Sequence, residues 1–492
     1  MRKWIALGGI VFSAACGSSG SDIKCGDGTT LDNGECVPQG SGSGVTCGAG
    51  TQLDSTGTMC IPTPPGATGA PTITGISENE GGISGGDLFE IQGTGFAGDD
   101  VTALHVYFGA TTPGSSGDLG PCEALIGPAT ATVITGQVPP DCTFSTSITI
   151  TVQTNLGMAT TPYLYDALFL ADGDDFYLNE PGHIYVVDPE AAKSFDLGNL
   201  VDSQGGTYNL DGMAFAGNTL YGVTTGDSEA DLDGVAQLVT IDLSTYDPTA
   251  GTVTVTPVSD LFDEADDAIY ASDLRVIGTT LYAWGYACSD GCAQGLVTID
   301  PTGSTSFVET SASETSFFGA LAVDGTGALT AAPNGAYPDT ANGATGELDS
   351  VDVGTGALTS TATLDWGIGA PITTMMYAGT TLLGVVDNGT YSAMVYDGET
   401  YPSYFGQTLA VIDPTATPIV GATILALPEQ IGAQARISAM DIPPTTFVIA
   451  RQVPTDRWKK LPAIGLEHQP QGSSIATAHA NIMNALHRRG AK

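Results

Sequence analysis

Positive charge is what this sequence lacks most. Its 492 residues include 13 Lys and Arg against 54 Asp and Glu, which gives a formal net charge of −41. Between positions 17 and 450 the only basic residues are Lys24, Lys193, Arg275 and Arg436. A surface this acidic repels phosphate backbones, so we expect no nucleic-acid partner.

Histidines are also scarce, and motifs of metalloproteases and phosphate-binding loops are absent. The chain has five histidines, and we identify no Gly-x-Ser-x-Gly nucleophile elbow, no His-Glu-x-x-His motif and no glycine loop ending in Gly-Lys. His105 and His183 each stand alone among predicted strands, so we interpret both as surface or core residues. Carboxylates are plentiful, which leaves paired-acid glycan chemistry open, although nothing in the sequence selects the pair.

Long apolar runs are missing except at the N-terminus, where the sequence begins MRKWIALGGIVFSAACG. Arg2 and Lys3 precede a short apolar stretch, and small residues follow it, which is typical of an export signal over residues 1–15. The cysteine after the small residues resembles the lipobox of bacterial lipoproteins, although Ser13 stands where that pattern usually has Leu. The resemblance implies that Cys16 is acylated and anchors the mature protein. Position 17 holds Gly17 and not the aspartate that resembles an inner-membrane retention signal, so the resemblance favours delivery to the outer membrane or cell surface. Ordinary cleavage after Ala15 is the alternative.

Nine cysteines are an odd number, so one thiol is left over if the others form disulfides. The segments CGDGTTLDNGECVP and CGAGTQLDSTGTMCIP repeat one pattern with too little apolar material for a core, which favours covalent staples. A zinc site would show closer cysteine knuckles or histidines. We predict four local disulfides, Cys25–Cys36, Cys47–Cys60, Cys122–Cys142 and Cys288–Cys292, which leave Cys16 for the lipid.

Short strands with glycine turns follow a Pro-rich spacer and predict a β-sandwich over residues 71–169. The segments IQGTGF, VYFG, GQVPP and ITITVQTNLGMA resemble the IPT/TIG family of immunoglobulin-like domains. The resemblance implies a spacer or binding module without catalytic residues. Gly93 and Gly95 are expected to allow a tight turn with positive φ, and Phe96 to cap the core.

A repeat array occupies the next segment. Five β runs each end in an aspartate before a turn, at Asp188, Asp242, Asp300, Asp352 and Asp413, with spacings of 52 to 61 residues. A hairpin pattern precedes four of them, so the sequence predicts a β-propeller of about five four-stranded blades over residues 170–446, with six or seven blades as the alternative. The aspartates are expected to accept backbone N–H groups two residues on. The first repeat lacks a strand pair, and ARISAMDI (435–442) is expected to close the ring, with TTFVIARQ (445–452) as the second strand.

Acidic loops are the one chemical lead. Asp227, Glu229, Asp231 and Asp233 alternate like calcium ligands, and the runs at 172–175 and 260–267 are similarly acidic. Two interpretations stay open, a Ca²⁺ site and a solvated acidic loop. The loop lacks the central glycine and distal glutamate of an EF-hand.

The last segment, 447–492, reverses the charge and holds three of the five histidines. Two interpretations stay open: a basic segment that docks on the acidic body or an anionic partner, and a segment that is not part of the fold. Of the two, we predict that segment 447–492 is not part of the fold.

The whole chain is therefore predicted to be an all-β protein. Its segments are a signal peptide (1–15), an acylated cysteine and tether (16–24), two Cys-rich repeats with a linker (25–70), a sandwich (71–169), a propeller (170–446) and a basic tail (447–492). The function expected is binding or scaffolding at the cell surface, with an extracellular glycan or protein as partner. The alternative is an extracellular carboxylate-dependent glycan or peptide hydrolase or lyase on the propeller.

Overall fold

The structure is a computed structural model. It describes residues 29–32, 35–38, 51–53, 60–62, 70–96, 104–109, 122–127, 129–140, 146–173, 182–188, 193–224, 235–263, 267–288, 292–309, 318–334, 347–363, 372–387, 392–396, 399–403, 407–413, 420–426, 436–444 and 459–460. All regular elements in these ranges are β-strands, which confirms the predicted all-β class. Within them no helix has the length and hydropathy needed to cross a membrane.

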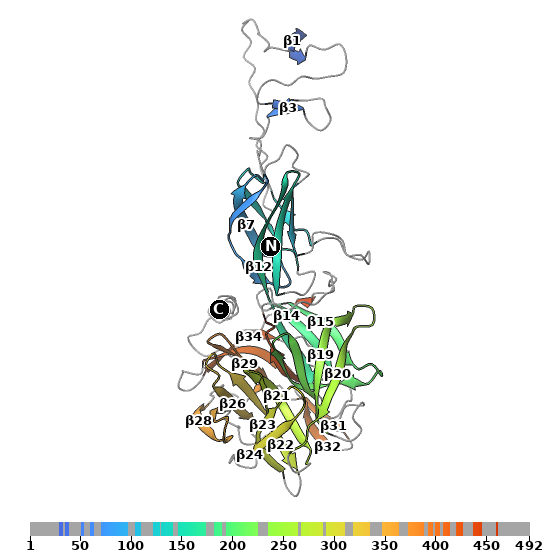
Figure 1. Ribbon diagram of the computed structural model, residues 1–492, viewed down its shortest axis with the longest axis vertical. Coiled ribbons are helices and arrows are strands. Elements are labelled where there is room, and N and C mark those ends of the chain that lie inside the picture. Colours follow the sequence, from blue (N-terminus) through green and yellow to red (C-terminus); the bar gives the residue numbers. More distant parts are fainter. Residues whose placement is uncertain are drawn as a thin grey trace, which may run out of the picture.

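The two Cys-rich repeats each form a small hairpin (Figure 1). The first pairs β1 (Thr29–Asp32) with β2 (Glu35–Pro38), and the second pairs β3 (Thr51–Leu53) with β4 (Cys60–Pro62). Cys36 lies opposite Leu31 and Cys60 opposite Leu53, so the sequence repeat is also a structural one. The other halves of both predicted disulfides, Cys25 and Cys47, lie outside the described residues.

The sandwich consists of two four-stranded sheets. One has the order β5 (Thr72–Ile76), β7 (Leu88–Thr94), β10 (Val133–Gln137), β9 (Leu125–Ile126). The other has the order β6 (Glu80–Gly82), β12 (Gly157–Asp166), β11 (Ser147–Thr154), β8 (His105–Phe108). Along β7 buried and exposed residues alternate, so one face of each sheet fills the core, as a sandwich requires.

The glycines before Phe96 act in two different ways. Gly95 has φ 77°, as expected for a tight turn, and Phe96 is fully buried. Gly93 has no positive φ; a Cβ there would lie 1.9 Å from the carbonyl oxygen of Thr72. Gly93 is therefore required by the close approach of β5 and β7, which corrects the turn role predicted for it.

Five four-stranded blades follow, which confirms the predicted propeller. From the axis outward, blade 1 is β35 (Arg436–Asp441), β13 (Leu168–Gly173), β14 (His183–Asp188) and β15 (Lys193–Val201). Blade 2 is β17 (Leu210–Ala216), β18 (Thr219–Thr224), β19 (Gln237–Asp247) and β20 (Thr252–Asp260). Blade 3 is β21 (Ile269–Ile277), β22 (Thr280–Cys288), β23 (Cys292–Ile299) and β24 (Thr305–Glu309).

The remaining blades keep the same order. Blade 4 is β25 (Phe318–Val323), β26 (Leu329–Asn334), β27 (Glu347–Val351) and β28 (Leu358–Thr363). Blade 5 is β29 (Ile372–Ala378), β30 (Thr381–Asp387), β33 (Gln407–Asp413) and β34 (Val420–Ala426). A hairpin of β31 (Ser392–Tyr396) and β32 (Glu399–Ser403) is inserted between β30 and β33. The first strands of the blades are almost wholly buried, because they surround the axis.

The ring is closed by β35, as the sequence predicts, because β35 pairs with β13 and packs against both β17 and β29. The second strand of that blade is β13 and not the segment 445–452, which lies outside the described residues. At the outer edge, β15 also pairs with β20 in parallel, so blades 1 and 2 are hydrogen-bonded to each other. The short strand β16 (Thr207–Tyr208) pairs with β15 as well.

The sandwich and the propeller share one hydrophobic core, which runs from Phe89 and Ile150 in the sandwich to Phe195 and Val253 in the propeller. Two hydrogen bonds cross the junction. The Ser84 amide donates to the buried Asp188 carboxylate over 2.8 Å, and the Thr146 hydroxyl donates to the Pro444 carbonyl over 2.7 Å. We call the end of the propeller at this junction the proximal end, and the opposite end, where the inner strands begin, the distal end (Figure 1).

Two residues of the predicted tail belong to the fold. β36 (Lys459–Lys460) pairs antiparallel with Lys193 and Ser194 of β15. The prediction that 447–492 is not part of the fold therefore does not hold for these two residues. The rest of the tail lies outside the described residues.

Candidate functional site at the propeller axis

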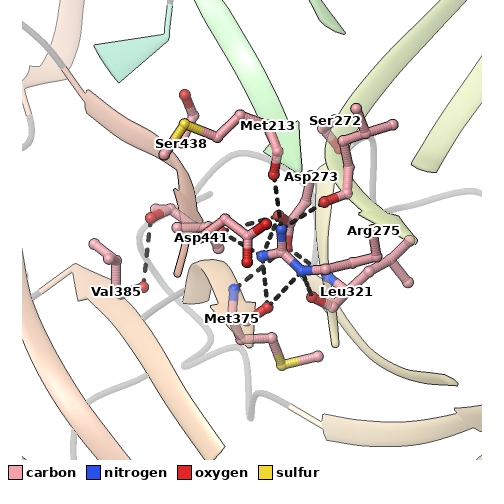
Figure 2. Close-up of polar contacts among 12 residues, drawn as sticks. Met213, Ser272, Asp273, Arg275, Leu321, Met375, Val385, Ser438 and Asp441 are labelled. Carbon is pink, nitrogen blue, oxygen red and sulfur yellow. Dashed lines mark hydrogen bonds and ion pairs between the residues drawn. The ribbon is translucent and has the colours of Figure 1, made fainter. Parts of the chain in front are cut away.

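A buried ion pair occupies the propeller axis (Figure 2). Arg275 and Asp273, both on β21, are joined over 2.6 Å, and both side chains are almost inaccessible to solvent. The Arg275 guanidinium also donates to the carbonyl oxygens of Met213, Leu321 and Met375, which lie on the inner strands of blades 2, 4 and 5. We call this pair the axial clamp, because one side chain connects the inner strands of four blades.

The Asp273 carboxylate completes the axial clamp. It accepts N–H groups from Leu321 and Met375 and the hydroxyl of Thr374. Burial raises the pKa of Asp273, while the Arg275 charge and these donors oppose that rise. Asp273 has φ 49°, the only positive φ of a non-glycine residue in the part of the chain that the structure describes. Backbone strain of this kind persists only where the surroundings fix the residue, as they do here.

The distal end carries a second polar cluster, on blade 1. The buried Asp172 carboxylate accepts the His183 amide and, over 3.3 Å, the Tyr185 hydroxyl. The imidazole Nδ1 of His183 lies 3.1 Å from Asp196, which in turn accepts the Gly198 amide over 2.7 Å. We call Asp172, His183, Tyr185 and Asp196 the distal cluster. His183 was interpreted as a surface or core residue; it is partly buried and lies between two carboxylates.

The distal cluster has perturbed protonation equilibria. Burial raises the pKa of Asp172 to about 7, although the His183 amide, the charge of His183 and the Tyr185 hydroxyl oppose the rise. For His183, burial lowers the pKa, but the hydrogen bond and charge of Asp196 and the charge of Asp172 outweigh it and raise the value. Burial, followed by the charges of Asp172 and Asp196, raises the pKa of Tyr185. Perturbed groups that meet in one place are a functional-site signal, although ion-pair networks also perturb pKa values.

The acidic segments singled out in the sequence all leave the propeller at its distal end. Asp227, Glu229, Asp231 and Asp233 lie outside the described residues, between the distal ends of β18 and β19. In the run at 260–267, Asp260 accepts the Gln237 amide group, and Asp263 accepts the Asp267 backbone amide. No group of three potential metal ligands occurs among the residues that the structure describes. The calcium site therefore stays a prediction.

The recurrent aspartates lie at the proximal end. Asp242, Asp300 and Asp352 each accept the amide two residues on, at 2.8 to 3.0 Å, which confirms the predicted turn role. These bonds, with hydroxyl donors, hold the pKa of Asp300 and of Asp352 below the ordinary value. Asp188 differs, because its carboxylate reaches the sandwich; the side chain of Asp413 is outside the described part.

Only some of the remaining predicted cysteine positions lie in the part of the chain that the structure describes. Cys122 is buried and disulfide-bonded, while its expected partner Cys142 lies outside the described residues. Cys288 and Cys292 are register partners in the β22–β23 ladder. Cys16 also lies outside the described residues. The pairings and the lipidation therefore stay predictions.

One motif was missed in the sequence. Gly82-Ile83-Ser84-Gly85-Gly86 matches the Gly-x-Ser-x-Gly pattern of a nucleophile elbow. That elbow requires a strand–turn–helix context, whereas here the segment follows the edge strand β6 and packs against the propeller. Ser84 is 2% exposed, and its amide is bound by Asp188. The segment is therefore part of the domain junction.

The chain is therefore an all-β protein in which a β-sandwich is followed by a five-bladed propeller. Residues 71–165 match the model of the IPT/TIG domain family, so the sandwich is an IPT/TIG domain, as its motifs suggested. No curated protein matches the chain.

Several solved structures are similar to parts of the chain. A structural-genomics protein of unknown function from Bacteroides thetaiotaomicron is 11% identical, with 78% of this chain and 97% of that chain covered and a TM-score of 0.29. A DUF4784 family protein from Bacteroides caccae is 12% identical, with 74% and 84% covered and a TM-score of 0.23. The GH43_1 enzyme from Xanthomonas citri, complexed with xylose, is 14% identical, with 47% and 90% covered and a TM-score of 0.27. Likeness at this level assigns no activity to the chain.

Proposed function

We propose that the protein is a lipid-anchored cell-surface binding or scaffold protein. In this proposal Cys16 holds the chain in the outer membrane or at the cell surface, and the distal end of the propeller meets an extracellular glycan or protein. The observation that carries the proposal is the core shared by sandwich and propeller. Because the sandwich joins the proximal end, a rigid connection there directs the distal end away from the hairpins β1–β2 and β3–β4 (Figure 1).

The test uses the full chain with a Cys16→Ser substitution, which keeps the protein free of lipid. This protein is screened against a glycan array and against surface extracts, with calcium present and with EDTA. The triple variant D227N/D231N/D233N removes three charges at the distal end. The matched control D242N/D300N/D352N removes three charges from exposed proximal turns.

Binding that disappears in the distal variant and survives in the proximal control supports the proposal. The proposal is contradicted if both variants lose binding equally. It is also contradicted if the protein captures no ligand, either with calcium or with EDTA. The anchor is checked separately by mass spectrometry of the N-terminal peptide from membranes, in which an unmodified Cys16 thiol contradicts acylation.

A second candidate is a carboxylate-dependent glycan or peptide hydrolase or lyase. The distal cluster favours it, because Asp172 is a buried carboxyl beside His183 whose pKa is raised to about 7. A general acid needs a pKa near the working pH. Release of reducing ends or peptides by the wild type, abolished in D172N, would support this candidate; binding without turnover would support the first.

A further inference from the structure

The proximal end of the propeller contains a pocket on the axis. Its volume is about 340 Å³, and residues from the inner strands of all five blades line it. Phe215, Val276, Tyr377 and Ile442 supply apolar walls, and Asp324 and Asp441 add carboxylates. We call this pocket the proximal funnel. Its volume is at the lower end of the range for small-molecule sites.

Two partly buried aromatic rings belong to the funnel wall. Phe215 is the next-to-last residue of the inner strand of blade 2 and packs edge-on against Phe169, with ring centroids 5.8 Å apart. Tyr377 is the next-to-last residue of the inner strand of blade 5. Burial raises the pKa of Tyr377, and the charge of the nearby Asp324 raises it further. An aromatic face beside a carboxylate is suited to a cation that has shed part of its water.

The charges that line the funnel are mainly negative. Asp324 is held ionised, because bonds from the Thr326 hydroxyl and nearby amides keep its pKa below the ordinary value. Asp441 accepts the Phe215 and Ile442 amides at 2.7 and 2.8 Å. The one basic side chain in the lining is Arg275.

Arg275 does not make the funnel an anion site. Its Nε and both terminal nitrogens donate to backbone carbonyls, to Thr374 and to Asp273, so its charge is already paired within the axial clamp. An anionic ligand would have to displace these contacts and would also meet Asp324 and Asp441. The strongly acidic chain further raises the local concentration of cations.

We infer that the proximal funnel binds a small organic cation on an aliphatic stem, an alkylguanidinium or alkylammonium group, with its charge between the Asp324 and Asp441 carboxylates and its stem along Phe215 and Tyr377. Such a group belongs to a free amine or to an arginine or lysine side chain of a partner. The inference is independent of the proposed distal function, because it concerns the opposite end of the propeller.

The experiment is calorimetric titration of the full-length Cys16→Ser protein with butylguanidine, with its neutral analogue butylurea, and with a capped tripeptide that has arginine at its centre. The aromatic wall is tested with Tyr377→Leu and the carboxylate with Asp324→Asn. The matched control is Asp300→Asn, because Asp300 and Asp324 build the same turn. Each accepts the amide and hydroxyl of a threonine two residues on, but Asp300 lies outside the funnel.

Butylguanidine should bind, and butylurea should not. An exposed ion pair and a cation–π contact are each worth up to about 1 kcal/mol, so D324N and Y377L should each raise the Kd by about two- to fivefold. D300N should leave the Kd unchanged. Tighter binding of the tripeptide than of butylguanidine identifies a partner side chain, and the reverse order identifies a free amine.

Three results would overturn the inference: no heat with either cation, equal affinity for butylurea, or the same effect of D300N and D324N. None of them bears on the distal screen, so failure of the funnel and failure of the proposed function are separable.

Discussion

Replacement of Arg275 by methionine tests the axial clamp. In the variant, Asp273 stays fully buried without its partner, and the carbonyls of Met213, Leu321 and Met375 lose a donor. Removal of one partner from a buried ion pair costs about 3–5 kcal/mol, because the remaining charge is uncompensated. At roughly 2–4 °C for each kcal/mol, the melting temperature should fall by on the order of 10 °C.

The assay is thermal unfolding followed by calorimetry, with two comparison proteins. Lys193→Met removes a partly exposed cation on β15 and should change the free energy of unfolding by no more than about 0.5 kcal/mol. The double variant D273N/R275M leaves no charge in the axial clamp and should be more stable than R275M alone. If R275M unfolds within about 1 kcal/mol of the wild type, or if the double variant is the less stable, the clamp does not hold the blades as described.

Three further predictions concern pH, the domain junction and calcium. Because the pKa of Asp172 is about 7 in the folded chain and lower when unfolded, the folded state binds more protons between about pH 4 and 7, so the free energy of unfolding should fall as pH rises. Asp273, whose pKa is also raised to about 7, and His183, whose pKa is raised, act in the same direction. D172N should therefore reduce the slope of the melting temperature against pH, whereas D242N should leave that slope unchanged. Asp188→Ala leaves the Ser84 amide without its acceptor and should cost about 1–3 kcal/mol in a denaturant titration; a variant as stable as the wild type would refute the role of this bond. EDTA should lower the melting temperature if the distal acidic loop holds calcium, and an unchanged melting curve would dispose of that site.

The blades were predictable because their turn chemistry is local. An aspartate that accepts the amide two residues on leaves a repeated signal in the sequence, as at Asp300 and Asp352. Ring closure by 435–442 was predictable from a missing strand. The second strand of blade 1 was not, because the apolar run at Leu168–Gly173 continues directly from the sandwich and its pattern fits either domain.

The axial clamp could not be derived, because its partners come from four blades that are distant in sequence. A signal did exist: Arg275 is the only cation between Lys193 and Arg436, and it stands in an apolar strand, where an unpaired charge is not tolerated. The distal cluster was missed for the same reason. His183 and Asp196 meet only through the pairing of β14 with β15, which the repeat pattern predicts without its register.

The pairing of β13 with β35 has a consequence for biosynthesis. β13 is made early, and its partner comes from near the other end of the chain. Until that partner is synthesised, the backbone edge of β13 is bare, and such an edge is prone to pair with other chains. A chain that stops before Arg436 therefore has an open ring and an unpaired β13 edge that can pair with other chains. In a chain that includes β35, this strand covers the β13 edge. A stop codon placed before β35 should accordingly give aggregated product, and one placed after β35 should give folded product.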